Sequence, residues 1–324
     1  MSGAPTNAPL RVKTLRSRLP RMLGLAAAIA ITAIAGARAD AISFTDFSTA
    51  GTTMDLRGSA TTATTPAGTV LSLTQANQSE QAGSAFVATP FTLGAGGAFS
   101  AQFQFQITPG STGGPADGFT FVLASLLSNT APLDPGGNLG YYGLTNSVAV
   151  EFDTYDNGVG TLDKGGTNDT NDNHIAIDVN GQLNDLASAS PYGVGNNSAW
   201  PCSSSVASDN PFGCMANGDL WTIQLGYDNG MLSVAASDNG QTPSLVIDNF
   251  PIDLTASVGQ TPYIGFTGAT GGSTSTQDIL NLNVTSDQTY SPVPEPGSLA
   301  LFATGLAGLL VWRRRRARGR HSSR

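Results

Sequence analysis

The chain has 324 residues, only 12% of them charged, with 39 glycines and a formal net charge of −8. Thirteen of its fifteen Lys and Arg lie before Asp40 or after Val284, so the part between holds two cations and twenty-one acids, a formal charge of −19. Such a surface repels nucleic acid and anionic lipid, which excludes them as partners of this part and leaves cations and neutral molecules.

The first residues have the organisation of a secretion signal. Basic side chains precede an apolar run over residues 22–36, and Ala37-Arg38-Ala39 has the small-x-small form of a signal peptidase site. We therefore expect residues 1–39 to be a cleaved signal peptide. A retained membrane helix is the weaker alternative, because the run is short and no polar stop-transfer flank follows it.

The last residues form a three-part tail. Pro294-Glu295-Pro296 precedes an apolar run over residues 298–312, and four arginines follow at 313–316. The run is shorter than the roughly 20 residues of a spanning helix, and the positive-inside bias places the arginines in the cytoplasm. This order resembles the PEP-CTERM sorting signal of Gram-negative bacteria, which an exosortase reads and cuts during export.

That resemblance divides the tail and implies a route for the protein. Residues 287–297 become a linker with the PEP motif, 298–312 a short apolar sorting or membrane segment, and 313–324 an Arg-rich cytoplasmic tail. The protein would be anchored transiently in the inner membrane through this segment alone and then reach the cell surface or extracellular matrix. A plain tail anchor is the alternative.

The two cysteines, Cys202 and Cys214, lie twelve residues apart in a segment rich in Ser, Asn and Pro. In an exported chain this spacing predicts one structural disulfide, worth about 3 kcal/mol for a loop this short.

The central part reads as short strands joined by turns. Residues 40–286 are rich in Gly, Ser, Thr, Asn and Val and poor in Lys and Glu, a composition that disfavours helices. Strands are expected at 71–73, 85–87, 99–107, 118–124, 148–154, 174–179, 220–227, 231–235, 245–247, 263–267 and 279–284. Asp228-Asn229-Gly230 is a hairpin signal. This many short strands predict an all-β fold, an antiparallel jelly-roll β-sandwich, with Trp221 and the aromatics of 99–107 in its core.

Residues 148–181 crowd carboxylates, amides and one His between two expected strands. Glu151 and Asp153 alternate with apolar neighbours, so both carboxylates lie on one face, and pairing with the strand that begins at His174 brings the imidazole to the same patch. Adjacent like charges favour a bound cation with oxygen ligands. The loop between the strands supplies Asn157, Asn168, Asp169, Asn171, Asp172 and Asn173.

Five motifs, in order, resemble those of the legume-type (L-type) lectins. They are ADGFTFVLA at 116–124, GGNLG at 136–140, VAVEFDTYDN at 148–157, HIAIDVN at 174–180 and YIGFTGATGG at 263–272. The resemblance covers nearly all of residues 40–286 and implies a concanavalin-like sandwich that binds carbohydrate.

The family pattern also implies two metal sites. Manganese or another transition metal would be bound by Glu151, Asp153, Asp169 and His174. Calcium would be bound by Asp153, the backbone carbonyl of Tyr155, Asn157 and Asp169. In plant members the acid equivalent to Asp169 follows the Asn within a few residues, whereas here residues 158–168 are inserted between Asn157 and Asp169. Asp169 is preferred because it lies five residues before His174, and Asp163 and Asp172 stay open as alternatives.

For the sugar, the family pattern implies the carboxylate of Asp117, the backbone N–H of Gly137 and the amide of Asn157. The loop of Thr270, Gly271 and Gly272 would close the rim. One acceptor and two donors give directional recognition of a neutral ligand.

The sequence thus predicts an exported, metal-dependent carbohydrate-binding protein that is not an enzyme, with a glycan or exopolysaccharide and an exosortase-type processing enzyme as partners. A structural matrix protein on a lectin scaffold without sugar binding is the alternative. A jelly-roll glycoside hydrolase is a weaker one, because Glu151-Phe152-Asp153-Thr154-Tyr155 lacks the third acid of an ExDxE pattern and metal would occupy the first two.

Overall fold

The computed structural model of the chain describes residues 40–111, 114–127, 134–158, 169, 171–189 and 214–286, without the side chains of residues 188 and 189. The expected signal peptide, the sorting tail, Asp163, Asn168 and Cys202 lie outside these residues. Within them, no helix is long and apolar enough to cross a membrane.

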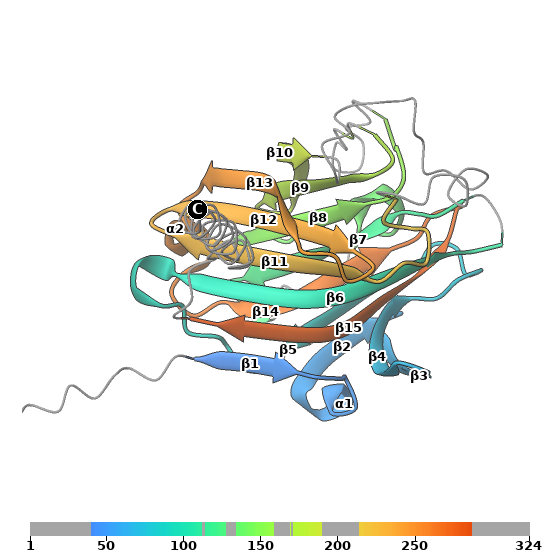
Figure 1. The fold of residues 1–324 in the computed structure, drawn as a ribbon, viewed down its shortest axis with the longest axis horizontal. Helices are drawn as coiled ribbons and strands as arrows, with labels where there is room; N and C mark the ends of the chain where they lie inside the picture. The colour runs from blue at the N-terminus through green and yellow to red at the C-terminus, as the bar shows by residue number, and fades with distance from the viewer. Residues whose placement is uncertain are drawn as a thin grey trace, which may run out of the picture. The chain divides into compact units, whose positions relative to one another are not determined.

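The described residues form two antiparallel sheets (Figure 1). One contains β1 (Ala41–Phe44), β3 (Thr61–Thr65), β4 (Gly68–Thr74), β6 (Phe99–Pro109), β11 (Trp221–Asp228), β12 (Met231–Asp238), β13 (Ser244–Pro251) and β15 (Ser275–Thr285). The other contains β2 (Met54–Gly58), β5 (Ala82–Val87), β7 (Gly118–Ala124), β8 (Ser147–Asp153), β9 (His174–Val179), β10 (Gln182–Ala189) and β14 (Tyr263–Ala269). Short helices α1 (Ala50–Thr53) and α2 (Leu254–Val258) and the 3-10 turns η1 (Ala95–Gly97) and η3 (Gly136–Asn138) connect them. The predicted all-β sandwich is confirmed.

All eleven predicted strands are present, and four further strands were missed. These four are β1, β2, β3 and β10; β2, β3 and β10 each end a sheet, and β1 pairs with β15 outside the main strand order. In β3, for example, the sequence TTATT has no buried residue. An edge strand buries little surface, so its sequence needs no strong apolar alternation.

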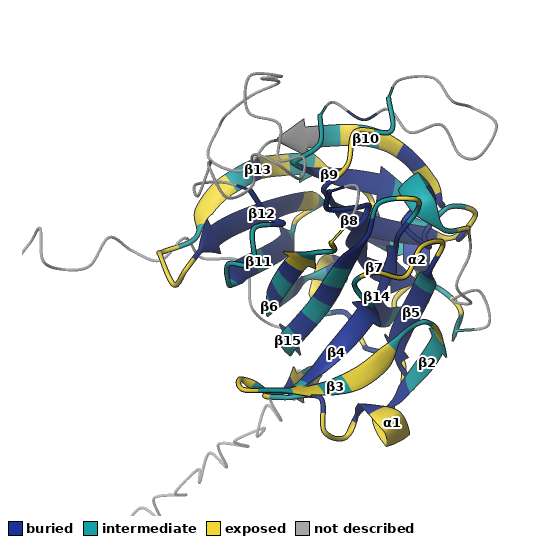
Figure 2. Ribbon diagram, turned by 90° about the vertical axis from the view of Figure 1, so that its right-hand side faces the viewer, coloured by how far each residue is buried: buried dark blue, intermediate teal, exposed yellow. Residues whose placement is uncertain are grey.

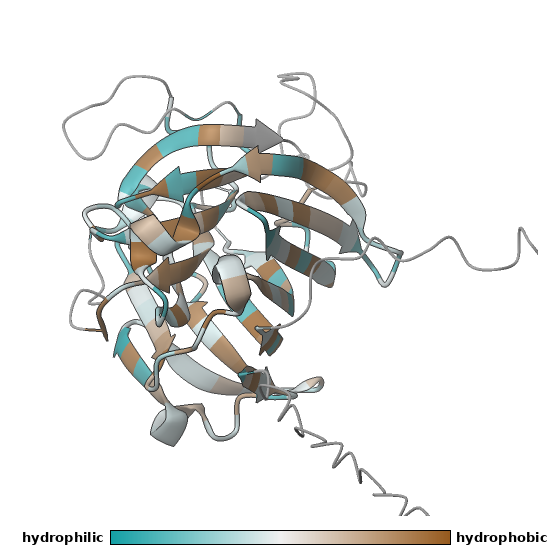
Figure 3. Ribbon diagram, turned by 90° about the vertical axis from the view of Figure 1, so that its left-hand side faces the viewer, coloured by the Kyte–Doolittle hydropathy of each residue, from teal (hydrophilic) through white to brown (hydrophobic). Residues whose placement is uncertain are grey.

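The core lies between the two sheets and is built largely from aromatic rings. The ring of Phe103 on β6 packs against five other phenylalanines: Phe105, Phe119, Phe121, Phe152 and Phe266. Trp221 is fully buried, as predicted, and Gln102 on the other face of β6 is exposed. Figure 2 shows buried residues along the central strands and exposed ones on β3 and α1. Figure 3 shows apolar and polar residues alternating along several strands, as expected for strands with one buried face.

The sheet register gathers the candidate site at one end of neighbouring strands. Asp153, the last residue of β8, lies opposite both Gly118 on β7 and His174 on β9. Ala269, the last residue of β14, also lies opposite Gly118. The predicted pairing of the two acidic strands is therefore confirmed. The predicted hairpin is present too, since Asp228 pairs with Met231 across Asn229-Gly230.

Candidate metal and carbohydrate site

Four buried side chains meet where β8 ends and β9 begins. Glu151, Asp153, Asp169 and His174 each offer a ligand atom, and these atoms all lie within 4.8 Å of one another. Asp172 is described but does not belong to this group. Of the two acids that the structure describes, Asp169 is therefore the one placed with His174.

Each ring nitrogen of His174 has a partner. Its Nδ1 lies 2.8 Å from the carbonyl oxygen of Asn171, which only accepts hydrogen bonds, so Nδ1 carries a proton and donates. Nε2 lies 3.1 Å from Glu151 Oε1. Although burial opposes it, hydrogen bonds to Asp185 and Glu151 raise the pKa of His174 well above its usual value, so without a metal ion Nε2 carries a proton and donates to these carboxylates. A metal ion bound at Nε2 would take the place of that proton. A carbonyl that fixes the tautomer in this way is typical of metal-binding histidines.

Two of the carboxylates also hold the backbone of the following turn. Asp153 Oδ1 accepts from the N–H of Tyr155 at 2.7 Å, and Asp169 Oδ2 accepts from the N–H of Asn157 at 2.5 Å. The side-chain oxygen of Asn157, Oδ1, is buried and has no hydrogen-bond partner among the described residues. Carboxylate, amide and backbone carbonyl oxygens are the ligands that calcium prefers, so this donor set fits that ion.

The pKa shifts of the buried carboxylates also fit a bound cation. Burial raises the pKa of Asp153 well above its usual range, and the charge of Asp169 raises it further. Burial likewise raises the pKa of Asp169 to about 8. Arg57, the one Lys or Arg that the structure describes, is paired with Asp55 on β2, at the opposite edge of the sheet from β10. Protons or a divalent cation must therefore balance these carboxylates.

Asp117 is placed beside the metal cluster from another strand. It directly precedes β7, follows a cis peptide bond from Ala116, and is 2% exposed. Its Oδ1 lies 3.5 Å from Nδ2 of Asn157, while Oδ2 is buried without a hydrogen-bond partner among the described residues. Burial raises its pKa to about 7, against the opposing effect of the Asn157 amide. The structure thus brings an acceptor with a spare oxygen next to an amide donor.

Glycine backbones complete the surroundings of Asp117 and Asn157. A β-carbon at Gly137 would lie 2.4 Å from Asn157 Oδ1, and one at Gly271 would lie 3.3 Å from Asp117 Oδ2. The N–H of Gly136 donates to the carbonyl of Thr270 at 3.1 Å, which ties the η3 turn to the end of β14. Asp117, Gly137, Asn157 and Gly271 therefore lie close together, and their role in binding sugar stays a prediction.

The expected rim residues divide into one buried residue and two nearer the surface. Thr270 is fully buried, and its hydroxyl donates to the carbonyl of Gln78 and accepts from the N–H of Gln81. Gly271 is partly exposed and Gly272 exposed. Thr270 thus anchors the loop through buried hydrogen bonds, while the two glycines lie nearer the protein surface.

Two acids near the site were not among the sequence-based site residues. Asp178 and Asp185 form a second group with Glu151, again with ligand atoms within 4.8 Å of one another. The alternation of β9 places Asp178 on the face of His174 and could have indicated it. Asp185 lies in β10, a strand without a sequence signal, so nothing in the pattern pointed to it.

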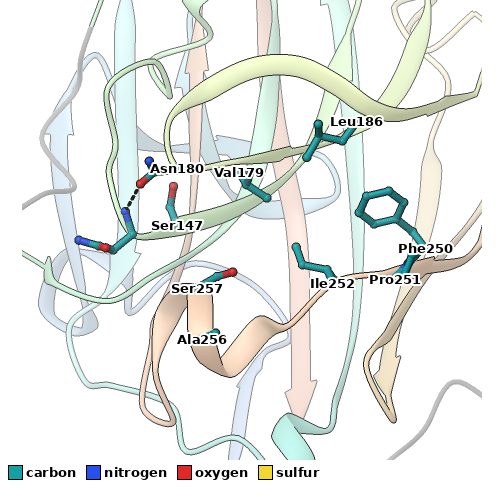
Figure 4. A pocket seen from close by; sticks show the side chains of 10 residues that line it. Ser147, Val179, Asn180, Leu186, Phe250, Pro251, Ile252, Ala256 and Ser257 are labelled. Atoms are coloured by element: carbon teal, nitrogen blue, oxygen red, sulfur yellow. Dashed lines mark hydrogen bonds between the residues drawn. The ribbon is translucent and has the colours of Figure 1, made fainter.

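A separate pocket of about 400 Å³ lies away from this cluster (Figure 4). Val179, Leu186, Phe250, Ile252 and Ser257 contribute to its lining. It also reaches the first residue of β8, whereas the metal cluster lies at the last. None of the predicted site residues lines it.

Comparison with known proteins decides the family. The description "Legume lectin domain" matches residues 39–298, and the "PEP-CTERM protein-sorting motif" matches residues 292–316. The chain belongs to the legume lectin family. Both resemblances read from the sequence are thereby confirmed, and membership in a carbohydrate-binding family agrees with the prediction that the protein is not an enzyme.

Individual lectins and lectin-like proteins match at low sequence identity over most of the domain. The lectin alpha chain of Lablab purpureus is 28% identical over 235 residues, covering 68% of this chain and 72% of that protein. A lectin-like protein of Arabidopsis thaliana is 28% identical over 194 residues, and the match covers 56% of this chain and 65% of the Arabidopsis protein. The solved lectin from Bauhinia forficata in complex with GalNAc shares the fold with a TM-score of 0.56 at 23% identity, covering 76% of this chain and 97% of that one.

The predicted disulfide stays a prediction. Cys214 is fully buried, at 0% exposure, in the segment that leads into β11. Its predicted partner, Cys202, lies outside the described residues.

Proposed function

We propose that this legume lectin family member is an exported protein whose carbohydrate binding depends on calcium. The observation that carries the proposal is the convergence of Asp117, Gly137 and Asn157 directly beside the metal cluster. Asp117 accepts hydrogen bonds from sugar hydroxyls through Oδ2, which has no protein partner among the described residues. The N–H of Gly137 and Nδ2 of Asn157 donate to the same sugar.

The metal-binding residues act on the sugar site through Asn157. Asp153, the carbonyl of Tyr155, Asn157 and Asp169 would hold calcium, and Glu151, Asp153, Asp169 and His174 would hold manganese or another transition ion. The bound ions supply the positive charge that these buried carboxylates need. Asn157 is then fixed with Oδ1 toward the metal and Nδ2 toward Asp117, so the sugar site is organised before its ligand arrives.

Export and location follow from the two ends of the chain. The match to the PEP-CTERM motif supports processing by an exosortase-type enzyme. Residues 1–39 would be the signal peptide, on the strength of their basic and apolar pattern. The protein would be anchored briefly in the inner membrane by residues 298–312 and end at the cell surface or in extracellular matrix. A formal charge of −19 over the lectin domain favours a neutral glycan or exopolysaccharide there.

The test is a glycan array followed by calorimetry, with the wild type, Asp117→Asn and the exposed control Asp248→Asn. The wild type and the control should bind glycan. Both should lose this binding when EDTA removes the metal ions and recover it when calcium is added back. Asp117→Asn should lose glycan binding and keep calcium, because Asp117 is not among the calcium ligands. Glycan binding that survives both chelation and Asp117→Asn would refute the proposal. Bound calcium with no glycan affinity in the wild type would instead favour the structural matrix protein.

A further inference from the structure

The loop before β5 places Glu80 beside the proposed sugar site. The N–H of Glu80 donates to the carbonyl of Gly271 at 3.1 Å, and a β-carbon at Gly271 would lie 3.3 Å from Asp117 Oδ2. Glu80 itself is exposed. Burial is the main cause that raises the pKa of Asp117, and the negative charge of Glu80 raises it further. One exposed carboxylate therefore lies near the buried one that would accept the sugar.

Hydrogen bonds hold this loop in place. The side chain of Gln81 accepts from the N–H of Gln75 at 3.1 Å and donates to the carbonyls of Gln75 and Gln78, each at 2.7 Å. The hydroxyl of Thr270 donates to the carbonyl of Gln78 at 2.9 Å. Glu80 thus extends from a backbone that is already ordered, so less entropy is lost when its carboxylate meets a ligand.

Two other loops around Asp117 each carry an exposed carboxylate as well. Asp134 lies two residues before η3, and Asp156 directly precedes Asn157. Both are exposed. We call Glu80, Asp134 and Asp156 the rim acids. Three loops from distant parts of the chain therefore surround the buried, unpartnered Oδ2 of Asp117 with surface charge of one sign.

Nothing among the described residues balances the rim acids. The site itself holds four buried carboxylates, whose charge two divalent ions would cancel: those of Asp117, Glu151, Asp153 and Asp169. Arg57, the one Lys or Arg that the structure describes, is already paired with Asp55 on β2. The inserted residues 158–168 contain one Asp and one Lys, so they add no net charge. Negative charge therefore remains at the surface around the sugar site.

We propose that the rim acids make the site selective for amino sugars, that is, for otherwise uncharged glycans that carry free, protonated amino groups, an inference that rests on the proposed sugar site. The charge of the domain excludes anionic partners and leaves cationic and neutral ones, and the rim acids decide between these two. An ammonium group donates charge-assisted hydrogen bonds to a carboxylate, whereas an acetylated amine carries no charge. A uronic acid would be repelled.

The first test titrates the disaccharides of glucosamine and of galactosamine into the full chain in excess calcium, each with free and with acetylated amines. An exposed pair of opposite charges strengthens binding up to about fivefold, so at least one free-amine disaccharide should bind about tenfold more tightly than its acetylated form. Added salt should shrink this difference, because it screens exposed charges. Equal or tighter binding of the acetylated forms, or no binding of either free-amine form, would overturn the inference.

A second test removes the charge of the rim acids in the triple variant Glu80→Gln, Asp134→Asn and Asp156→Asn. The preference for the free amine should fall below about twofold, while calcium affinity stays that of the wild type. The matched control carries Asp46→Asn, Asp228→Asn and Asp248→Asn, which remove the same charge from strands of the other sheet or residues next to them, and it should keep the preference. A tenfold preference that persists in the rim variant would overturn the inference.

Glu80→Gln alone keeps the test independent of whether the triple variant folds. It should reduce the preference for the free amine about two- to fivefold, and no reduction would overturn the inference. Free-amine binding that survives Asp117→Asn would also overturn it, because the attraction would then come from the whole acidic surface.

The proposed function can fail separately. A glycan that binds through calcium and Asp117 with no preference for free amines would refute this inference alone. A preference that needs the rim acids and Asp117 but persists in EDTA would refute the calcium dependence alone.

Discussion

Replacing Gly137 by Ala tests how the sugar site depends on Asn157. The new β-carbon would lie 2.4 Å from Oδ1 and 2.5 Å from Cγ of Asn157, where ordinary contacts begin at 3.4 Å, so the amide must retreat by about 1 Å. Gly137 does not have a left-handed φ, so alanine fits its backbone. The strain therefore falls on one side chain and the fold should survive.

The expected loss of calcium and glycan affinity follows from the two ligands that Asn157 would contact. Calcium–oxygen distances are about 2.3–2.6 Å, so a displacement of about 1 Å removes Oδ1 from the ion. The same movement takes Nδ2 away from the sugar beside Asp117. We expect calcium affinity to fall about 10- to 100-fold, or about 1.4–2.7 kcal/mol, with glycan affinity falling at least as far.

The assay is calorimetric titration of calcium and then of glycan into wild type, Gly137→Ala and Gly51→Ala. Gly51 in α1 is the control because it is exposed, lies outside the candidate site, and a β-carbon there would meet nothing within 4 Å. Thermal melts in EDTA should show the same metal-free stability for Gly137→Ala and the wild type. If Gly137→Ala binds calcium and glycan like the wild type, Asn157 does not couple the two sites and the reasoning is wrong.

Phe103→Ala should lower the free energy of unfolding by about 3–5 kcal/mol in urea titrations, because five rings lose their shared neighbour; a loss under about 1 kcal/mol would contradict this. In the metal-free protein, Asp153 and Asp169 have native pKa values raised by burial above the usual 3.8, the second to about 8. The native state then binds more protons than the unfolded chain between about pH 4 and 8, so its stability should fall as pH rises through that window. Melts in EDTA should show this fall, saturating calcium should remove it, and a rise in EDTA would be the wrong sign. Finally, Cys202→Ser should lower the free energy of unfolding by about 3 kcal/mol under oxidising conditions. If a reductant leaves the stability of the wild type unchanged, this argues against the disulfide with Cys214.

The local pattern of residues determined much of the candidate site. Alternation in β8 and β9 places carboxylates and imidazole on one face, and the pairing of Asp153 with His174 follows from joining these two strands. The aromatic face of β6 was equally readable, because side chains in a strand alternate strictly between core and solvent. The family motifs added Asp117 and Gly137 from distant parts of the chain, which periodicity alone does not connect.

Other features depended on contacts that no local pattern encodes. The inserted residues 158–168 separate Asp169 from β8, so its position in the cluster emerges only in three dimensions. Thr270 is turned inward by hydrogen bonds to a loop almost two hundred residues earlier. Asp185 lies on an edge strand whose bulge is fixed by Asp178, and edge strands carry little apolar signal. Sequence alternation determined which face each side chain takes, whereas only strand register, a bulge and loop packing decided which distant acids share one site.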